Sequence, residues 1–357
     1  MTTTAPPRVP ARRSDRLDLL APLAAGWLGL GGALALLGTV TGAGYPFGAD
    51  DPNREANLLR LVPADLGPPV FAGVLLTAAV LALTLAAPAA RPARPVRAVL
   101  LGYGWAVASV LTVVVPGMQV LVILGYLPIL LVGAPFGWPP VDYADVFTGA
   151  LAARVASIVG GVLLAGALLV WQRRTSGACA ACGRDGADRG WRTPAAAARW
   201  GRWAAWTAAA VPFGYALTRF AWAVGIPLGI DPEFLGGMRE SGAVWAGAGL
   251  GAFATVGAVL TLGLVARWGE LFPRWIPVLA GRRVPVALAV VPATVVAIAV
   301  TGTGLSALSS ASFWDLGDGV VAWGPLLFFP LWGVALGAAT YAYHLRRRGA
   351  CHRCDRG

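Results

Sequence analysis

Residues 66–88 read LGPPVFAGVLLTAAVLALTLAAP, a run without a single charged side chain. A helix needs about 20 mainly apolar residues to cross the hydrocarbon core of a bilayer, so this stretch predicts a transmembrane helix. Seven further runs have a similar length and composition: 18–42, 97–116, 147–171, 203–224, 243–266, 284–305 and 320–345. The sequence therefore predicts an all-α integral membrane protein with eight transmembrane helices.

The overall composition supports this fold class and narrows the possible chemistry. Of 357 residues, 57% are hydrophobic and 13% are charged, which is too apolar for one water-soluble core. The two histidines, His344 and His352, lie near the C-terminus, so the predicted membrane interior has none to bind haem or metal. All basic residues are arginine, which excludes lysine Schiff-base catalysis. Because no nucleophile elbow, P-loop or H-E-x-x-H motif occurs, we predict that the chain is not an enzyme.

The loops between the predicted spans differ in charge. Twenty-three of the 28 arginines lie in the N-terminal arm, the loops 89–97 and 267–283, the segment 172–202 and the C-terminal tail. The opposite loops carry 11 of the 17 acidic residues. Since positively charged loops stay in the cytoplasm, we expect a multi-pass plasma-membrane protein with both termini cytoplasmic. The net charge of +11 then reflects orientation and contact with the lipid bilayer, and predicts no nucleic-acid partner.

Three sequence matches in the same order indicate an internal duplication. Each segment of the first half has a counterpart in the second: residues 44–52 match 225–232, residues 79–83 match 258–262, and residues 174–182 match 346–354. With four spans in each copy, the copies run the same way through the membrane and are related by an axis near its normal. We predict a disordered basic arm over 1–17, a first four-helix repeat over 18–182, a cytoplasmic linker over 183–201 and a second four-helix repeat over 202–357.

The copies differ mainly between their third and fourth spans. The first copy has an additional apolar segment, 117–133, that starts with Gly117 and includes Gln119. A ninth span here would place the arginine-rich linker outside, against the charge rule. We therefore expect either a longer bent helix or a re-entrant piece.

All four cysteines form two C-x-x-C pairs, and each pair follows the last span of its repeat. The residues are Cys179, Cys182, Cys351 and Cys354. Four thiolates from two such pairs can bind one zinc ion tetrahedrally, and the duplication would bring the pairs together across the pseudo-twofold axis. A shared structural zinc site is the preferred interpretation. Redox or metal-sensing dithiols and inert reduced cysteines are the alternatives, and His352 is a possible substitute ligand.

Two arginines lie close to membrane depth, where an ionisable side chain is a candidate functional residue. Arg219 is near the outer end of the predicted fifth span, and its counterpart in the first repeat is Gly38. Arg154 lies near the outer end of the fourth span. Each can bind a small anionic solute. The preferred interpretation is that they extend to the lipid headgroups or pair with an acid, namely Asp142, Asp145 or Asp231.

The repeated outer turns each end in Asp-Pro, at Asp51 and Asp231. Their proline and glycine residues favour rigid, helix-breaking loops. A second interpretation is an outer vestibule where the two carboxylates approach each other, with oxygen atoms near Asp51 sufficient for a weak cation site.

The stretch from Tyr215 to Pro232 and the terminal arginine-rich C-x-x-C resemble multi-pass membrane proteins of high-GC actinobacteria. The resemblance implies a membrane protein and brings no activity with it.

Two hypotheses about function follow from the residues. The first is a permease-like or solute-binding protein with a site near the axis between the repeats. The alternative is a membrane scaffold, or a zinc or redox sensor, that engages a cytoplasmic protein partner through its four cysteines.

Overall fold

The computed structural model describes residues 16–42, 47, 51, 57–63, 65–87, 92–136, 142–186, 190–309 and 320–354. In this part of the chain the only β-type pairing is an isolated bridge between Leu271 and Arg283, so the prediction of an all-α protein is confirmed. Among the described residues, six helical stretches are long and apolar enough to span a membrane. They are α1 (Leu20–Thr41, after the 3-10 helix η1, Arg16–Leu19), α2 (Gly67–Ala86), α3 (Arg94–Ser109, continued by the π-helix η5, Val110–Val114), α6 (Gly149–Thr175), α9 (Ala243–Gly263) and α10 (Val286–Leu308).

The helices of the remaining two predicted spans are not among these six. The helix α7 (Pro194–Ala223) has 30 residues and begins inside the stretch assigned to the linker. Thr193 caps it by accepting a hydrogen bond from the N–H of Ala196, and Pro194 suits its first turn. The predicted span 320–345 is divided into α12 (Val320–Leu327) and α13 (Phe329–Arg347). The count of eight spans therefore remains a prediction.

The additional segment of the first half forms a helix of its own. The helix α4 (Gln119–Gly133) has 15 residues, which gives a length of about 22 Å, short of a hydrocarbon core of about 30 Å. A turn at Gly117, with φ +60°, separates it from η5. It packs against α10 and α6 and is not a continuation of the preceding helix.

Several short elements lie between the long helices. On the side where α4 ends they are η4 (Leu58–Leu61), η6 (Ala134–Phe136), α5 (Tyr143–Val146) and α8 (Pro232–Glu240), and before α7 lies η7 (Gly190–Arg192). The helix α8 begins at a side-chain cap, because Asp231 Oδ1 accepts from the N–H of Glu233 at 2.6 Å. Most of the first repeated turn, residues 44–52, lies outside the described residues, which include only Phe47 and Asp51 of it.

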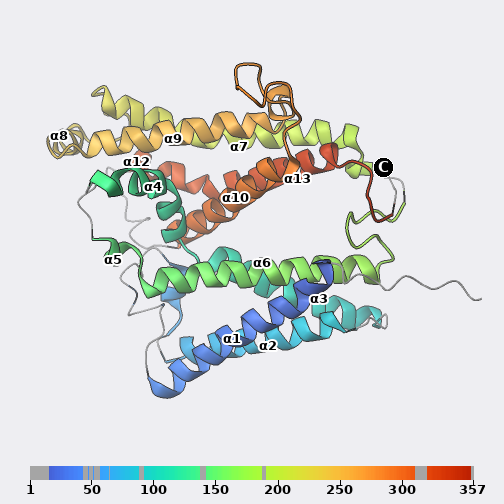
Figure 1. Ribbon diagram of the computed structural model, residues 1–357. Coiled ribbons are helices and arrows are strands. Elements are labelled where there is room, and N and C mark those ends of the chain that lie inside the picture. The colour runs from blue at the N-terminus through green and yellow to red at the C-terminus, as the bar shows by residue number, and fades with distance from the viewer. Residues whose placement is uncertain are drawn as a thin grey trace, which may run out of the picture.

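The long helices form two groups, α1, α2, α3 and α6 in one and α7, α9, α10 and α13 in the other (Figure 1). In each group the first helix packs on the second and on the fourth, and the third packs on the fourth. The main contacts between the groups are those of α10 with η5 and α4. There a side chain at Gly302 would collide with the carbonyl oxygen of Val113, so the two groups are closely packed at this point.

Small residues allow the helices within each group to approach closely. In the first group Ala24, Ala78 and Ala82 are fully buried, and in the second group Ala205 and Ala208 are. The last helices of the two groups, α6 and α13, end on the same side of the molecule (Figure 1). The two C-x-x-C segments follow these ends directly.

Candidate metal centre

The four cysteines meet at the ends of α6 and α13. The Sγ atoms of Cys179 and Cys351 are 3.9 Å apart, and those of Cys182 and Cys354 are 3.6 Å apart. All four Sγ atoms lie within 4.8 Å of one another. The prediction that the two C-x-x-C pairs come together is therefore confirmed, although 172 residues separate each cysteine from its partner.

These distances fit a metal ion and do not fit disulfides. Four sulfur atoms placed about 2.3 Å from a zinc ion at tetrahedral angles lie about 3.8 Å apart, close to the two measured separations. A disulfide needs about 2.05 Å between its sulfur atoms, and all four cysteines are free thiols. Among ions that take four thiolates, zinc and iron are the usual occupants.

Local backbone structure explains why each pair can present its thiols. In the first pair, Gly183 adopts φ +74° and its N–H donates to the carbonyl of Cys179 at 2.7 Å. The N–H of Cys179 in turn donates to the carbonyl of Arg184 at 2.9 Å. In the second pair the N–H of Cys354 donates to the carbonyl of Cys351 at 3.2 Å. Each C-x-x-C segment is thus a closed turn with both sulfurs on one side.

Backbone N–H groups also favour the thiolate form of the first cysteine in each pair. The N–H groups of Cys182 and Ala181 donate to the sulfur of Cys179 and lower its pKa to about 6. The N–H groups of Arg353 and Cys354 likewise lower the pKa of Cys351. Burial has the opposite effect on Cys182 and raises its pKa to about 11. Since metal binding requires thiolates, a cation would bind to the first cysteines and displace the remaining protons.

Arginines surround the cysteine cluster and connect its two halves. Arg173 Nη1 donates to the carbonyls of Ala180 and Ala181, at 3.1 and 2.9 Å. Arg184 is buried and its Nη1 donates to the carbonyl of Gly349 at 3.1 Å, across to the second pair. Four thiolates around a divalent ion carry a net charge of −2, which these guanidinium groups offset. His352 is exposed and does not belong to the four-atom cluster.

Arg154 lies at the other side of the molecule and is buried in an ion pair. Its Nη2 donates to Oδ2 of Asp51, and both side chains are almost fully buried, with 1% and 0% exposed. The guanidinium carbon is 6.0 Å from the ring centroid of Phe47. The Nε and Nη1 atoms of Arg154 have no hydrogen-bond partner in the described part of the chain. The structure thus pairs Arg154 with Asp51, whereas Asp231 is exposed at the start of α8.

Arg219 has a different environment. Its guanidinium carbon lies 4.5 Å from the ring centroid of Tyr215 and 4.1 Å from that of Trp222, so the charge sits between two aromatic faces on its own helix. Cation–π contacts of this kind stabilise a partly desolvated guanidinium. Gly247 and Gly251 of α9 leave room for the arginine side chain.

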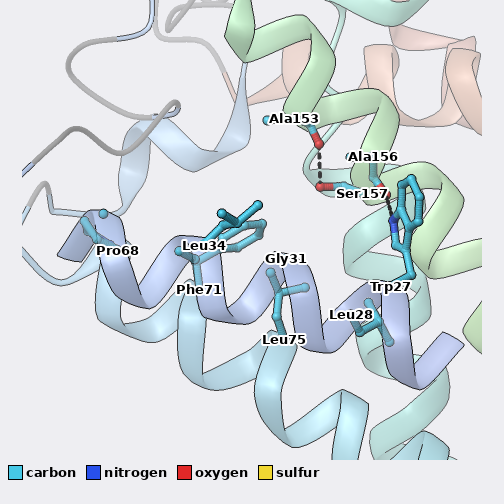
Figure 2. Close-up of a pocket in the computed structure, with 12 residues that line it drawn as sticks. Trp27, Leu28, Gly31, Leu34, Pro68, Phe71, Leu75, Ala153, Ala156 and Ser157 are labelled. Carbon is cyan, nitrogen blue, oxygen red and sulfur yellow. Dashed lines mark hydrogen bonds between the residues drawn. The ribbon is translucent and has the colours of Figure 1, made fainter. Parts of the chain in front are cut away.

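In the first group, Gly38, which aligns with Arg219 in the predicted repeat, lines a cavity of about 260 Å³ between α1, α2 and α6. Figure 2 shows that apolar side chains form most of the wall. The polar groups in it have internal partners, because Trp27 Nε1 donates to the carbonyl of Ala156 at 2.9 Å and Ser157 Oγ donates to that of Ala153 at 2.9 Å. The cavity therefore offers little to a charged solute.

A second set of contacts near the cysteines was not predicted from the sequence. Arg346 Nη1 pairs with Glu270 Oε1 at 2.9 Å, Arg347 Nη2 donates to the carbonyl of Val284 at 2.9 Å, and Tyr343 donates to that of Gly269 at 2.8 Å. These contacts fasten the loop after α9 to the end of α13. Glu270 is the only acid in the arginine-rich loop 267–283, and this isolated carboxylate could have indicated a contact with the arginine-rich tail.

Comparisons with protein-family models, with curated proteins and with solved structures find no match.

Proposed function

We propose that this chain is an integral membrane protein whose function resides in its four-cysteine centre. In this proposal Cys179, Cys182, Cys351 and Cys354 bind one zinc ion that joins the two helix groups on the cytoplasmic side. The protein then acts as a membrane scaffold or a zinc sensor, because occupancy of the site determines how the two groups are held and which surface they offer to a cytoplasmic partner. The observation that carries this proposal is the approach of the four Sγ atoms to within 4.8 Å.

Zinc is the preferred ion for chemical reasons. The site consists of four sulfur donors in closed turns and includes no open ligand position for a substrate, as is typical of structural zinc sites. A reducing cytoplasm keeps such cysteines as thiols. The redox alternative, in which the same cysteines respond to an oxidant, needs them to be free of metal.

Metal analysis of the purified protein tests the proposal. We expect about one zinc per chain, because four thiolates and one divalent ion form a complete tetrahedral site. Cys179→Ser should lose most of the metal, whereas His352→Ala should keep it, since His352 is exposed and does not belong to the four-sulfur cluster. Iron in place of zinc, no metal, or unchanged zinc in Cys179→Ser would each contradict the proposed site.

We further propose two parallel four-helix repeats in the plasma membrane, with both termini in the cytoplasm. The same helix pairings in both groups and the arginine-rich loops on one side support this arrangement. The resemblance to actinobacterial membrane proteins fits it as well.

Thiol labelling in cells tests this orientation. Native Cys179 and Cys351 should resist a membrane-impermeant thiol reagent in intact cells and react after permeabilisation with a chelator. A cysteine placed at Val224, which is 72% exposed at the opposite end of α7, should react in intact cells. Labelling of the native cysteines from outside would show that the orientation is wrong.

A permease-like or solute-binding role is the second candidate. Its specific support is Arg154, whose buried Nε and Nη1 have no partner in the described residues and could bind a small anionic solute. Arg219 supports it less, because two aromatic rings already enclose its guanidinium. The close packing at Gly302 between the groups also favours the scaffold or sensor over a path along the axis.

A further inference from the structure

The second helix group contains a large apolar crevice that the metal centre does not use. It has a volume of about 760 Å³, within the range of about 300–1,000 Å³ that is usual for ligand sites. Its walls come from α9, α10 and α13, and the loop after α9 closes one end. The wall residues are almost entirely apolar and include Leu260, Leu264, Leu288, Ala293, Val296 and Leu336.

The loop over the crevice is an ordered hairpin, here called the hairpin segment, residues 267–284. It starts with the 3-10 helix η8 (Arg267–Gly269). Its two arms are joined by hydrogen bonds from the N–H of Phe272 to the carbonyl of Arg282 and from the N–H of Val284 to that of Glu270, both 3.0 Å. The contacts of Tyr343, Arg346 and Arg347 described above hold it against α13. The hairpin segment at the mouth of the crevice is therefore held in place by α13.

The outer surface of the hairpin segment combines large apolar and basic side chains. Trp275 and Val278 are 80% and 83% exposed, and in Figure 1 the segment, drawn in orange, projects from the end of α9 beyond the outer side of the second helix group. Four exposed arginines accompany them, and none forms an ion pair within the described part of the chain: Arg267, Arg274, Arg282 and Arg283. Tryptophan and arginine together are typical of the lipid headgroup region of a membrane.

We propose that the crevice and the hairpin segment form a binding site for an anionic phospholipid. One acyl chain fills the apolar crevice, where burial of hydrocarbon is favourable. The lipid phosphate lies against the arginines of the hairpin segment, because guanidinium groups bind phosphate oxygens through paired hydrogen bonds. A soluble anion would bind only the arginines and leave the apolar crevice without an occupant. A lipid has both an anionic headgroup and an acyl chain, so it can occupy both parts of the site.

The site can be tested by thermal unfolding of the full-length protein in detergent after removal of bound lipid. Phosphatidylglycerol should raise the unfolding midpoint by on the order of a few degrees, because a ligand that binds only the folded state stabilises it. Phosphatidylcholine with the same chains should raise it clearly less. Glycerol phosphate, which carries the headgroup charge without chains, should have no effect.

Two variants separate the parts of the site. Arg274→Gln/Arg282→Gln should remove the preference for phosphatidylglycerol, whereas Arg202→Gln, at an exposed arginine of α7, should keep it. Ala293→Phe fills the crevice and should abolish stabilisation by both lipids, whereas Ala252→Phe, on an exposed face of α9, should not. Equal stabilisation by the two lipids, an equal effect of glycerol phosphate, full stabilisation of Ala293→Phe, or no effect of any lipid on the wild type would each overturn the proposal.

Discussion

Cys351→Ser is expected to lower the free energy of unfolding of the purified protein by several kcal/mol. Structural zinc contributes roughly 10–16 kcal/mol of apparent binding free energy in small zinc modules. Only part of this should be lost here, because the contact of α10 with η5 and α4 still holds the two helix groups together. Thermal unfolding in detergent, with zinc content measured on the same sample, checks the expectation.

A chelator provides the matching control on the wild-type protein. If the ion stabilises the fold, removal of zinc should lower the unfolding midpoint as much as Cys351→Ser does, and added zinc should restore only the wild type. The variant His352→Ala should behave as the wild type in both treatments. A chelated wild type as stable as the zinc-bound form would contradict a structural role for the metal, even if zinc binds.

The helices could be predicted well from the sequence because crossing a bilayer requires long apolar runs. The run at 66–88 became α2 (Gly67–Ala86), and the run at 147–171 became α6 (Gly149–Thr175). Prediction was weaker where proline intervenes. The run at 320–345 contains Pro325 and Pro330, and the structure interrupts it at Phe328, since proline lacks the N–H that an uninterrupted helix needs.

The meeting of the four cysteines could be predicted because three sequence matches in the same order place the two C-x-x-C pairs at equivalent positions, each after the last predicted span of its half. The partner of Arg154 could not be predicted in this way. Asp51 precedes it by 103 residues, and the rotation of each helix decides which side chains face each other. In lipid the outer face of a helix is as apolar as the inner face, so hydrophobic periodicity does not reveal that rotation. The aromatic rings around Arg219 could have been predicted from the sequence, because Tyr215 and Trp222 lie four residues before it and three after it, on the same helix face.

Arg154→Gln is expected to destabilise the protein by about 3–5 kcal/mol, because removal of one partner leaves the other charge buried. The reason is the environment of the pair, whose two side chains are 1% and 0% exposed. Asp51→Asn should cost a similar amount, since the guanidinium loses the carboxylate that the structure places beside it. The double variant Arg154→Gln/Asp51→Asn holds no buried charge and should regain much of the loss. Thermal unfolding of the three variants measures the coupling.

Arg219→Gln is the matched control, because its guanidinium is half-buried between aromatic rings, where such contacts contribute about 0.5–2 kcal/mol. Arg219→Gln should therefore destabilise the protein less than Arg154→Gln does.

The same variants test solute binding, since a small anion bound at Arg154 should stabilise the wild type and, more strongly, Asp51→Asn, in which the competing carboxylate is neutral. It should not stabilise Arg154→Gln. A double variant no more stable than either single one would show that Arg154 and Asp51 do not act as a pair, and equal anion effects on all variants would remove the support for a solute site at Arg154.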